Sequence, residues 1–248
     1  MLLEGKKALI TGAGSGIGEA TAKRMAVEGA SVLVVDVNDE GGKRVVAEIT
    51  EAGGTAAFHH TDISNVDEVD AMVKAAVDAF GGLDLAVNNA GLAERPGRLH
   101  ELDPAEYHRV LGVDLHGTFY SMRAEIAYFI TAGGGVIVNT ASGAGEKATP
   151  GLTAYSTAKH GVIGLTRTGA IDYVRDNIRV NAVAPGTILT PGMRGMGDEQ
   201  MAIYADLVPM GRMGTPEEVA ASIVWLLSDQ SSFVTGTVLE IDGGYMQG

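Results

Sequence analysis

The sequence predicts an α/β fold in which a doubly wound, mostly parallel sheet of seven strands carries helices on both faces. Short apolar runs alternate with helical segments throughout the chain, which is the pattern of parallel β-α-β units. A glycine-rich turn follows the first apolar run, and 248 residues suffice for one large domain with a substantial core. No repeat or linker-like tract interrupts the pattern, so we expect one domain over residues 1–248. Its strands are expected near residues 7–11, 31–36, 55–60, 83–88, 135–140, 178–184 and 238–241.

Local sequence justifies the main elements in turn. Residues 7–10 and 31–35 are apolar runs typical of strands, and residues 135–140 form a β-branched run after three glycines, which indicates a buried strand. A helix is expected from about 17 to 28. Asp103 and Thr215 each mark a helix start, because a proline follows directly and an acidic residue occupies the third helical position. The helix after Asp103 is predicted to run from Ala105 to about Ala132.

The turn after the first strand and the end of the second strand suggest a dinucleotide site. Glycines spaced Gly12-x-x-x-Gly16-x-Gly18 permit positive φ and let backbone amides approach a pyrophosphate at a helix N-terminus. The spacing differs from the strict G-x-G-x-x-G fingerprint, and close helix–strand packing is the alternative explanation. Asp36 ends the second strand, where a carboxylate accepts hydrogen bonds from ribose hydroxyls and repels a 2′-phosphate. Because the turn contains no Arg or Lys, NAD is predicted rather than NADP.

Tyr155 and Lys159 lie four residues apart in a predicted helix, so they share one of its faces. A neighbouring positive charge lowers the pKa of a tyrosine from its usual value of about 10, which suits general acid–base work near neutral pH. A solvated helix that carries this pair by chance is the alternative. Ser142 follows the strand at 135–140, where its hydroxyl can bond a substrate oxygen or merely cap a turn.

Further segments complete an ordered set of motifs: Thr11-Gly12-x-x-x-Gly16-x-Gly18, Asp62, Asn88-Asn89-Ala90-Gly91, Ser142, Tyr155-x-x-x-Lys159, Asn181 and Pro185-Gly186-Thr187-Ile188-Leu189-Thr190. Over essentially its whole length the chain thereby resembles the short-chain dehydrogenase/reductase family, in its compact single-domain branch. The resemblance implies a Rossmann-type fold and an NAD-dependent oxidoreductase that interconverts a secondary alcohol and its ketone by hydride transfer.

The resemblance also implies a role for each matched residue. Tyr155 would pass the hydroxyl proton, Lys159 would assist it and bond the nicotinamide ribose, and Ser142 would orient the carbonyl. Asp62 would contact the adenine, although Ser64 and the acidic residue three positions later also fit a helix start there. The expected cofactor-binding residues are Gly12, Ser15, Gly16, Ile17, Gly18, Asp36, Asp62, Ile63, Asn89, Ala90, Gly91, Tyr155, Lys159, Pro185, Gly186, Ile188 and Thr190. For Asn89 and Thr190, an ordinary turn is the alternative.

Asp114 departs from the family pattern, because family members usually carry an asparagine there that is implicated in a water-mediated proton relay to the lysine. Aspartate keeps an acceptor but does not donate when ionised. A relay through the main-chain carbonyl would be little affected by the change. We retain Asp114 as a predicted catalytic residue and expect its charge to weaken the effect of Lys159 on Tyr155, which would raise the working pH.

The resemblance places a substrate lid at about residues 188–210, and residues 92–96 form a second candidate wall. The lid is rich in methionine, at Met193, Met196, Met201 and Met210. Methionine suits irregular apolar ligands, whereas packing of the lid onto the domain is the alternative. We therefore expect a moderately apolar substrate. His116 and His160 lie near the catalytic segments, but surface or packing roles are favoured for both.

Composition excludes several classes of partner. The formal charge of −13 disfavours binding to nucleic acid or to an anionic membrane surface. No segment resembles a signal peptide or a membrane span, cysteine is absent, and the histidines form no zinc motif, so we expect a cytoplasmic protein without a metal. Residues 234–244 resemble the last strand of the family, whose members commonly form tetramers. A homo-oligomer, and by resemblance a homotetramer, is therefore expected.

Two other functions stay open. One is a 3-oxoacyl-thioester reductase of the same family that uses NADPH, against which Asp36 argues. The other is a dinucleotide-binding regulatory protein without turnover, which would not need the Tyr155–Lys159 pair.

Overall fold

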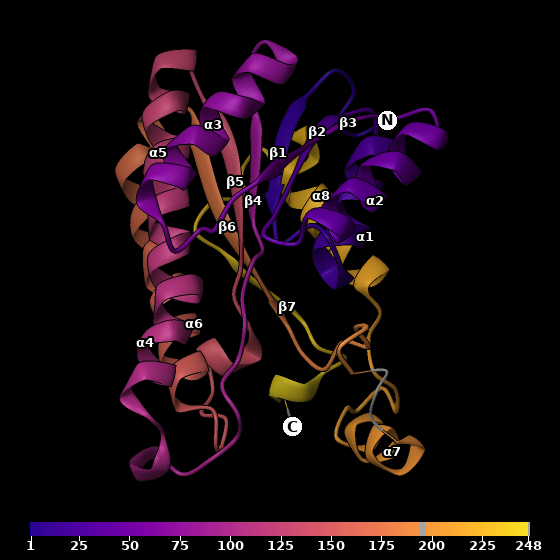
Figure 1. The fold of residues 1–248 in the computed structure, drawn as a ribbon, viewed down its shortest axis with the longest axis vertical. Helices are drawn as coiled ribbons and strands as arrows, with labels where there is room; N and C mark the ends of the chain where they lie inside the picture. The colour runs from indigo at the N-terminus through magenta and orange to yellow at the C-terminus, as the bar shows by residue number, and fades with distance from the viewer. Residues whose placement is uncertain (194–196, 248) are drawn as a thin grey trace.

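The computed structural model describes residues 1–193 and 197–247, and it confirms the predicted fold class. Within these residues, seven parallel strands form one sheet in the order β3-β2-β1-β4-β5-β6-β7, which is a doubly wound topology (Figure 1). The strands are β1 (Lys7–Thr11), β2 (Ser31–Asp36), β3 (Thr55–His60), β4 (Leu85–Asn88), β5 (Gly135–Thr140), β6 (Ile178–Pro185) and β7 (Val238–Ile241).

Helices cover both faces of the sheet (Figure 1). Helices α1 (Gly16–Val27), α2 (Asp39–Glu51) and α8 (Pro216–Leu227) pack on one face, and α3 (Val66–Phe80), α5 (Thr118–Ala132) and α6 (Thr153–Tyr173) pack on the other. Alternate residues of β1 and β2 enter the two resulting cores. Ala8, Ile10, Val32 and Val34 face one core, whereas Leu9, Leu33 and Val35 face the other. Burial on both sides explains why these strands are continuous apolar runs.

Strand β4 begins at Leu85, two residues later than the sequence predicts. The side chain of Asp84 explains the difference, because its Oδ2 accepts a hydrogen bond of 2.8 Å from the backbone N–H of Lys7. A side-chain acceptor thus occupies the position just before regular pairing with β1 begins at Ala8.

The single helix predicted between Ala105 and Ala132 is interrupted. Helix α4 (Pro104–Leu111) leads into a π-helical turn over Gly112–Gly117, and α5 continues from there. Single π-helical turns inside α-helices often occur at functional sites, and this one carries Asp114. The predicted starts at Asp103 and Thr215 are both confirmed. Asp103 accepts a hydrogen bond from the N–H of Ala105, and Thr215 forms a capping box with Glu218.

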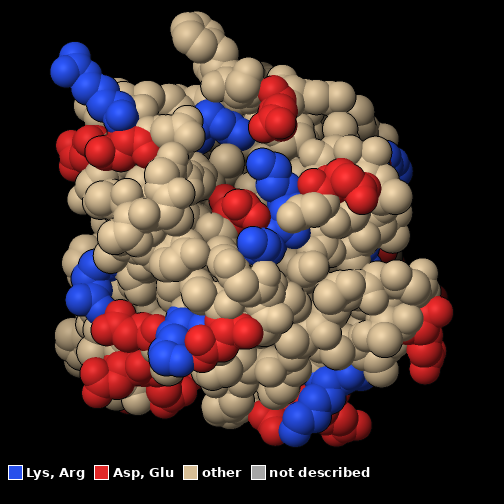
Figure 2. Space-filling model, turned by 90° about the horizontal axis from the view of Figure 1, so that it is seen from above, with Lys and Arg blue, Asp and Glu red and all other residues tan. Residues whose placement is uncertain are grey.

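Acidic and basic side chains lie side by side on the face seen from above (Figure 2). In the described part of the chain, five ion pairs join side chains four residues apart, such as Lys43 with Asp39 on α2. Among the described residues, no helix is both long enough and apolar enough to span a bilayer.

Candidate functional site

A cleft of about 560 Å³ opens at the carboxyl ends of β1, β2 and β4. Eleven of the expected cofactor-binding residues line it: Gly12, Ser15, Gly16, Ile17, Asp36, Asp62, Ile63, Asn89, Ala90, Gly91 and Thr190. Residues from five separate segments of the chain thus converge where ligands bind in open α/β sheets. Val37, Thr61, Leu92 and Val113 also line the cleft. Each of the four adjoins a predicted site residue, but only Leu92 was itself predicted, as part of the second candidate wall.

The glycine-rich turn forms one wall of the cleft, and its glycines are required in two ways. Gly12 and Gly16 adopt φ of 63° and 56°, a left-handed conformation that favours glycine. Gly18 does not line the cleft, because it faces the backbone of the turn. A Cβ on Gly18 would lie 2.1 Å from the carbonyl oxygen of Gly12. Close packing therefore explains Gly18, while Gly12 and Gly16 shape the cleft itself.

Asn89 and Thr11 fix the floor between β1 and β4. The Asn89 side chain donates to the carbonyls of Thr11 and Gly12, at 3.1 and 3.2 Å. In return, the Thr11 hydroxyl accepts the backbone N–H groups of Asn89 and Ala90, at 3.0 and 3.1 Å. Thr11 begins the glycine-rich motif and is not among the predicted site residues. It acts by holding the residues that line the cleft.

Asp36 lies at the rim of the cleft with its carboxylate held in place. One oxygen accepts the N–H of Gly14 at 2.7 Å, and the other accepts the N–H of Asn38 at 2.8 Å. Arg44, thirty residues after Gly14, donates to the Gly14 carbonyl at 3.1 Å. The sequence-based argument that the turn holds no basic residue therefore missed one that folding brings there.

The charge of Arg44 is already paired. Its guanidinium forms ion pairs with Glu19 and Glu48, and Lys23 joins the same pair of carboxylates. The hydrogen bond from Arg44 lowers the pKa of Glu19 to about 2, so this carboxylate stays ionised at neutral pH. The positive charge beside the turn is thus largely neutralised within the protein.

Asp62 also lines the cleft and is oriented by its neighbour. Its Oδ1 accepts hydrogen bonds from the backbone N–H and the hydroxyl of Ser64, at 2.9 and 2.7 Å. The helix that follows begins at Val66 and is capped by Asn65, whose side chain accepts the N–H of Asp67. The alternative helix start at Ser64 is therefore wrong by one residue.

Tyr155 and Lys159 both lie on α6, as the sequence predicts, but in different environments. Lys159 is only 3% exposed, and its Nζ lies 5.4 Å from the centroid of the half-buried Tyr155 ring. The Lys159 ammonium donates to the carbonyl of Thr140 at the end of β5, at 3.0 Å. Burial by itself lowers the pKa of Lys159, but the charges of Asp114 and Tyr155 and the hydrogen bond to Asp114 together raise this pKa above its ordinary value.

Asp114 forms a buried ion pair with Lys159. Its Oδ2 lies 3.2 Å from Lys159 Nζ, and its Oδ1 accepts the N–H of Leu92 at 2.8 Å. Its main-chain carbonyl accepts the hydroxyl of Thr118 at 2.7 Å. Gly91 allows the pair to form, because a Cβ there would lie 3.0 Å from the carboxylate and 3.2 Å from the ammonium. The side chain of Asp114 thus places a carboxylate directly on the lysine.

Ser142 caps a short 3-10 turn, Gly143–Gly145, through its Oγ, which accepts the N–H of Ala144 at 3.1 Å. Ser142 therefore does cap a turn, which was the alternative to a role at the site. Capping does not prevent the hydroxyl from also bonding a substrate oxygen. No described residue accepts a hydrogen bond from this hydroxyl, so its proton is free for a ligand oxygen. The turn packs against α6, where a Cβ on Gly145 would lie 2.8 Å from the backbone of Lys159.

Pro185, Gly186 and Ile188, which were also predicted to bind the cofactor, do not line the cleft. Pro185 ends β6, the N–H of Gly186 donates to Ile241, and Ile188 pairs with Gly214 in an isolated bridge. Asn181 is buried and ties β6 to the segment before β7, through bonds to Val234 and Thr237.

The bridge between Ile188 and Gly214 closes the base of the predicted lid. Helix α7 (Asp198–Asp206) lies in the lid and has no buried residue, while Leu207 and Met210 are exposed. Packing of the lid onto the domain therefore accounts for Val208, which is 4% exposed, but not for Leu207 and Met210. Met196 lies outside the described residues. His116 and His160 are exposed and line neither the cleft nor the cavity below, in agreement with the predicted surface roles.

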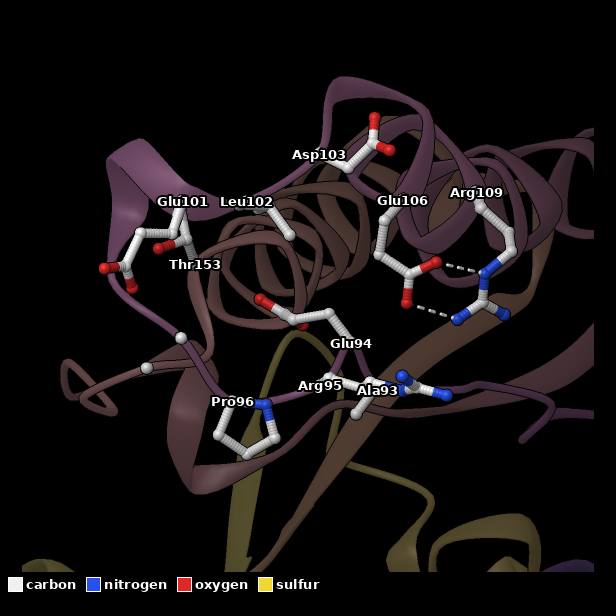
Figure 3. A pocket seen from close by; sticks show the side chains of 12 residues that line it. Ala93, Glu94, Arg95, Pro96, Glu101, Leu102, Asp103, Glu106, Arg109 and Thr153 are labelled. Atoms are coloured by element: carbon white, nitrogen blue, oxygen red, sulfur yellow. Dashed lines mark hydrogen bonds and ion pairs between the residues drawn. The ribbon is translucent and has the colours of Figure 1, made fainter.

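A larger cavity, of about 880 Å³, lies on the other side of the second candidate wall (Figure 3). Ala93, Glu94, Arg95 and Pro96 line it, whereas Leu92 lines the cleft. The start of α4 and Thr153 of α6 close the other sides. Ser142, Tyr155 and Lys159 do not line this cavity. Among the described residues, no cluster of metal-ligating side chains occurs in either cavity.

Comparison with known proteins agrees with this geometry. A family model described as Enoyl-(Acyl carrier protein) reductase matches residues 12–246. The chain is 45% identical over 240 residues to cyclohexanol dehydrogenase from Acinetobacter sp. (strain SE19), covering 97% of this chain and 94% of the relative. It is 44% identical over 238 residues to cis-4-hydroxycyclohexanecarboxylate dehydrogenase from Sinomonas cyclohexanicum, covering 96% and 95%.

A solved structure agrees equally well. The 3-ketoacyl-(acyl-carrier-protein) reductase from Brucella melitensis, complexed with NADH, superposes with a TM-score of 0.92 and 39% sequence identity, covering 98% of this chain and 99% of that one. Similarity at this level extends over the glycine-rich turn, the Tyr155–Lys159 helix and the last strand alike. The chain belongs to the short-chain dehydrogenase/reductase family of oxidoreductases.

Proposed function

We propose that the protein is an NAD-dependent dehydrogenase that interconverts a secondary alcohol and its ketone, with Tyr155 as the general acid and base. The observation that carries the proposal is the buried Lys159 ammonium beneath the Tyr155 ring, on a helix beside the cleft. Mere binding of a dinucleotide would not need this pair, which argues against a regulatory protein without turnover.

The cleft fits a dinucleotide. Its volume lies within the usual range for ligand pockets, and the positive φ of Gly12 and Gly16 bares backbone amides at the start of α1. Asp36 favours NAD, because its carboxylate is already held by two backbone N–H groups and would repel a 2′-phosphate. Arg44, which donates to the Gly14 carbonyl, is engaged by Glu19 and Glu48. When bound, the nicotinamide supplies or accepts the hydride.

The side chains of the protein handle the proton and the polarity of the substrate. In alcohol oxidation, Tyr155 takes the hydroxyl proton, and it returns that proton in ketone reduction. Ser142 donates its free hydroxyl proton to the substrate oxygen, and Lys159 holds a positive field beneath the phenol. Positioned general acid–base catalysis contributes about 10²–10⁴ in rate, or roughly 3–5 kcal/mol of barrier.

A cyclic, moderately apolar alcohol is the substrate class that we propose. Two relatives more than 40% identical are named for cyclohexanol and for a hydroxycyclohexane carboxylate. The exposed apolar residues of the lid would cover such a ring. A 3-oxoacyl-thioester reductase is the second candidate, because the Brucella melitensis reductase shares the fold over nearly the whole chain.

Steady-state kinetics decide between the two candidates. We expect a higher kcat/KM with NAD than with NADP for cyclohexanol and related alcohols. A low rate with a 3-oxoacyl thioester and NADPH should accompany it. A clear preference for NADPH together with thioester reduction would reject the proposal in favour of the reductase.

The Asp114–Lys159 pair predicts an altered pH profile. The Asp114→Asn variant removes the negative charge that counters the positive charge of Lys159 near the Tyr155 phenol. The Asn side chain has nearly the same size as Asp and keeps one acceptor oxygen. The pH at which alcohol oxidation reaches half its maximal rate should therefore fall. The pH dependence of kcat/KM measures the shift, and an unchanged profile would show that the Asp114 charge does not act on Tyr155.

We further propose a cytoplasmic homo-oligomer, with a homotetramer as the expected size. β7 is an edge strand, and Phe233, close before it, is fully exposed. An edge strand and an aromatic side chain in this position are suited to burial against a second copy. Light scattering measures the assembly, and a monomer would contradict the proposal.

A further inference from the structure

Glu94 is a buried carboxylate that holds the start of the helix bearing Tyr155. It is 4% exposed, and its two oxygens accept the backbone N–H groups of Ala154 and Tyr155, at 2.6 and 3.0 Å. These residues occupy the second and third positions of α6. Glu94 belongs to the loop after β4, sixty residues earlier in the chain.

Helix α6 lacks a capping side chain of its own. Its N-cap residue is Leu152, which makes no side-chain cap hydrogen bond. The first amides of a helix have no partner within the helix, and a carboxylate there also gains from the helix dipole. Glu94 therefore replaces the missing cap from another segment, with two charge-assisted hydrogen bonds.

The same loop is tied to the other half of the site. The N–H of Leu92, two residues before Glu94, donates to Asp114, and Asp114 pairs with Lys159 on α6. The contacts thus link the loop after β4 to α6 at two points, directly through Glu94 and Tyr155 and indirectly through Leu92, Asp114 and Lys159. A shift of this loop would therefore move the phenol relative to the ammonium.

Among the residues that the structure describes, no cation forms an ion pair with Glu94. Figure 3 shows its carboxylate in the wall of the larger cavity, apart from the dashed contacts that join Glu106 to Arg109. A buried carboxylate needs hydrogen bonds to offset its desolvation, and the two helix amides provide them. Removing the carboxylate would therefore leave the first amides of α6 without an acceptor.

We propose that Glu94 is a positioning residue, which fixes the first turn of α6 and thereby the place of the Tyr155 phenol. The proposal rests on the proposed function, since it assigns Glu94 a part in the same reaction. It makes a distinctive prediction: loss of Glu94 impairs the chemical step more than the binding of either ligand. A merely structural carboxylate would lower stability and leave kcat per folded enzyme unchanged.

The Glu94→Gln variant tests this. Gln keeps the shape but replaces one acceptor with an amide N–H that opposes a helix N–H. We expect kcat for cyclohexanol to fall about 10- to 100-fold, in the range that small misplacements of catalytic groups produce. The KM for cyclohexanol and the Kd for NADH should change less than about threefold, within the scatter of individual contact energies. Glu94→Asp, which keeps the charge and both oxygens, should show a smaller loss.

Glu106→Gln is the matched control, because Glu106 lines the same cavity but bonds Arg109 instead of a helix amide. Its kcat should equal that of the parent. Hydrogen exchange at Ala154 and Tyr155 gives a second readout and should accelerate in Glu94→Gln only. An unchanged kcat in Glu94→Gln, with NAD-linked turnover present in the parent, overturns the inference. A parent without turnover rejects the proposed function instead, and the exchange rates then still decide whether Glu94 holds the helix start.

Discussion

Replacing Tyr155 with phenylalanine should lower kcat by about 10²–10⁴ and leave the Kd for NADH nearly unchanged. The substitution removes one hydroxyl and keeps the ring that lies over the Lys159 ammonium. No other described hydroxyl combines a place on this helix face with a buried cation beneath it. The proton of the substrate alcohol would then have to pass to water.

The comparison is made with single-turnover kinetics and with NADH fluorescence titration. Tyr173→Phe is the control, because Tyr173 ends the same helix, is partly buried against the core and does not line the cleft. It should retain parental turnover. Turnover by Tyr155→Phe at the parental rate would exclude Tyr155 as the acid–base group, whereas loss of NADH binding would indicate a damaged cleft.

The strands could be predicted from local sequence. The bounds of β1, β2, β3, β5 and β7 agree with the prediction to the residue. β1 and β2 are covered on both faces, so they are continuous apolar runs. The glycine-rich turn was equally visible, since positive φ and close packing both demand glycine.

The contacts that set the chemistry of the site were not predictable in this way. The π-helical turn at Asp114 continues a helical sequence, and nothing local marks where the hydrogen-bond register changes. Glu94 meets α6 across sixty residues of sequence, and Arg44 meets Gly14 across thirty. Periodicity assigns a residue to an element and a face, whereas a distance between two elements depends on how the whole sheet and its helices pack.

A buried network of polar side chains also joins segments that are far apart in the sequence. The side-chain amide of Asn88 donates to Glu125 and to Asn139, each at 3.0 Å, and Asn139 donates to Thr166 at 2.9 Å. All four residues are buried and come from four elements: β4, α5, β5 and α6. Glu125 Oε1 and Asn88 Oδ1 receive no hydrogen bond from any described group. A proton on Glu125 would make this carboxyl group a hydrogen-bond donor as well as an acceptor.

Burial raises the pKa of Glu125 to about 8, against an opposing hydrogen bond from Asn88. At neutral pH the folded protein therefore holds the carboxyl in its protonated form, while the unfolded chain, with its ordinary value of 4.5, has released the proton.

Glu125→Gln should consequently abolish a pH dependence of stability that the parent shows. The folded pKa lies above the unfolded one, so the contribution of Glu125 is fully present below about pH 4.5 and is lost as the pH rises to about 8. The shift corresponds to on the order of 5 kcal/mol in the free energy of unfolding. Gln keeps an acceptor for Asn88 Nδ2 and stays uncharged at every pH. The difference in free energy of unfolding between Glu125→Gln and the parent, measured by urea unfolding, should therefore grow in favour of Gln from about pH 5 to about pH 9.

Glu51→Gln, at an exposed position, is the control and should show no such growth. Parallel pH profiles for Glu125→Gln and the parent would mean that Glu125 is ionised in the folded protein, because a group that is charged in both states leaves no slope.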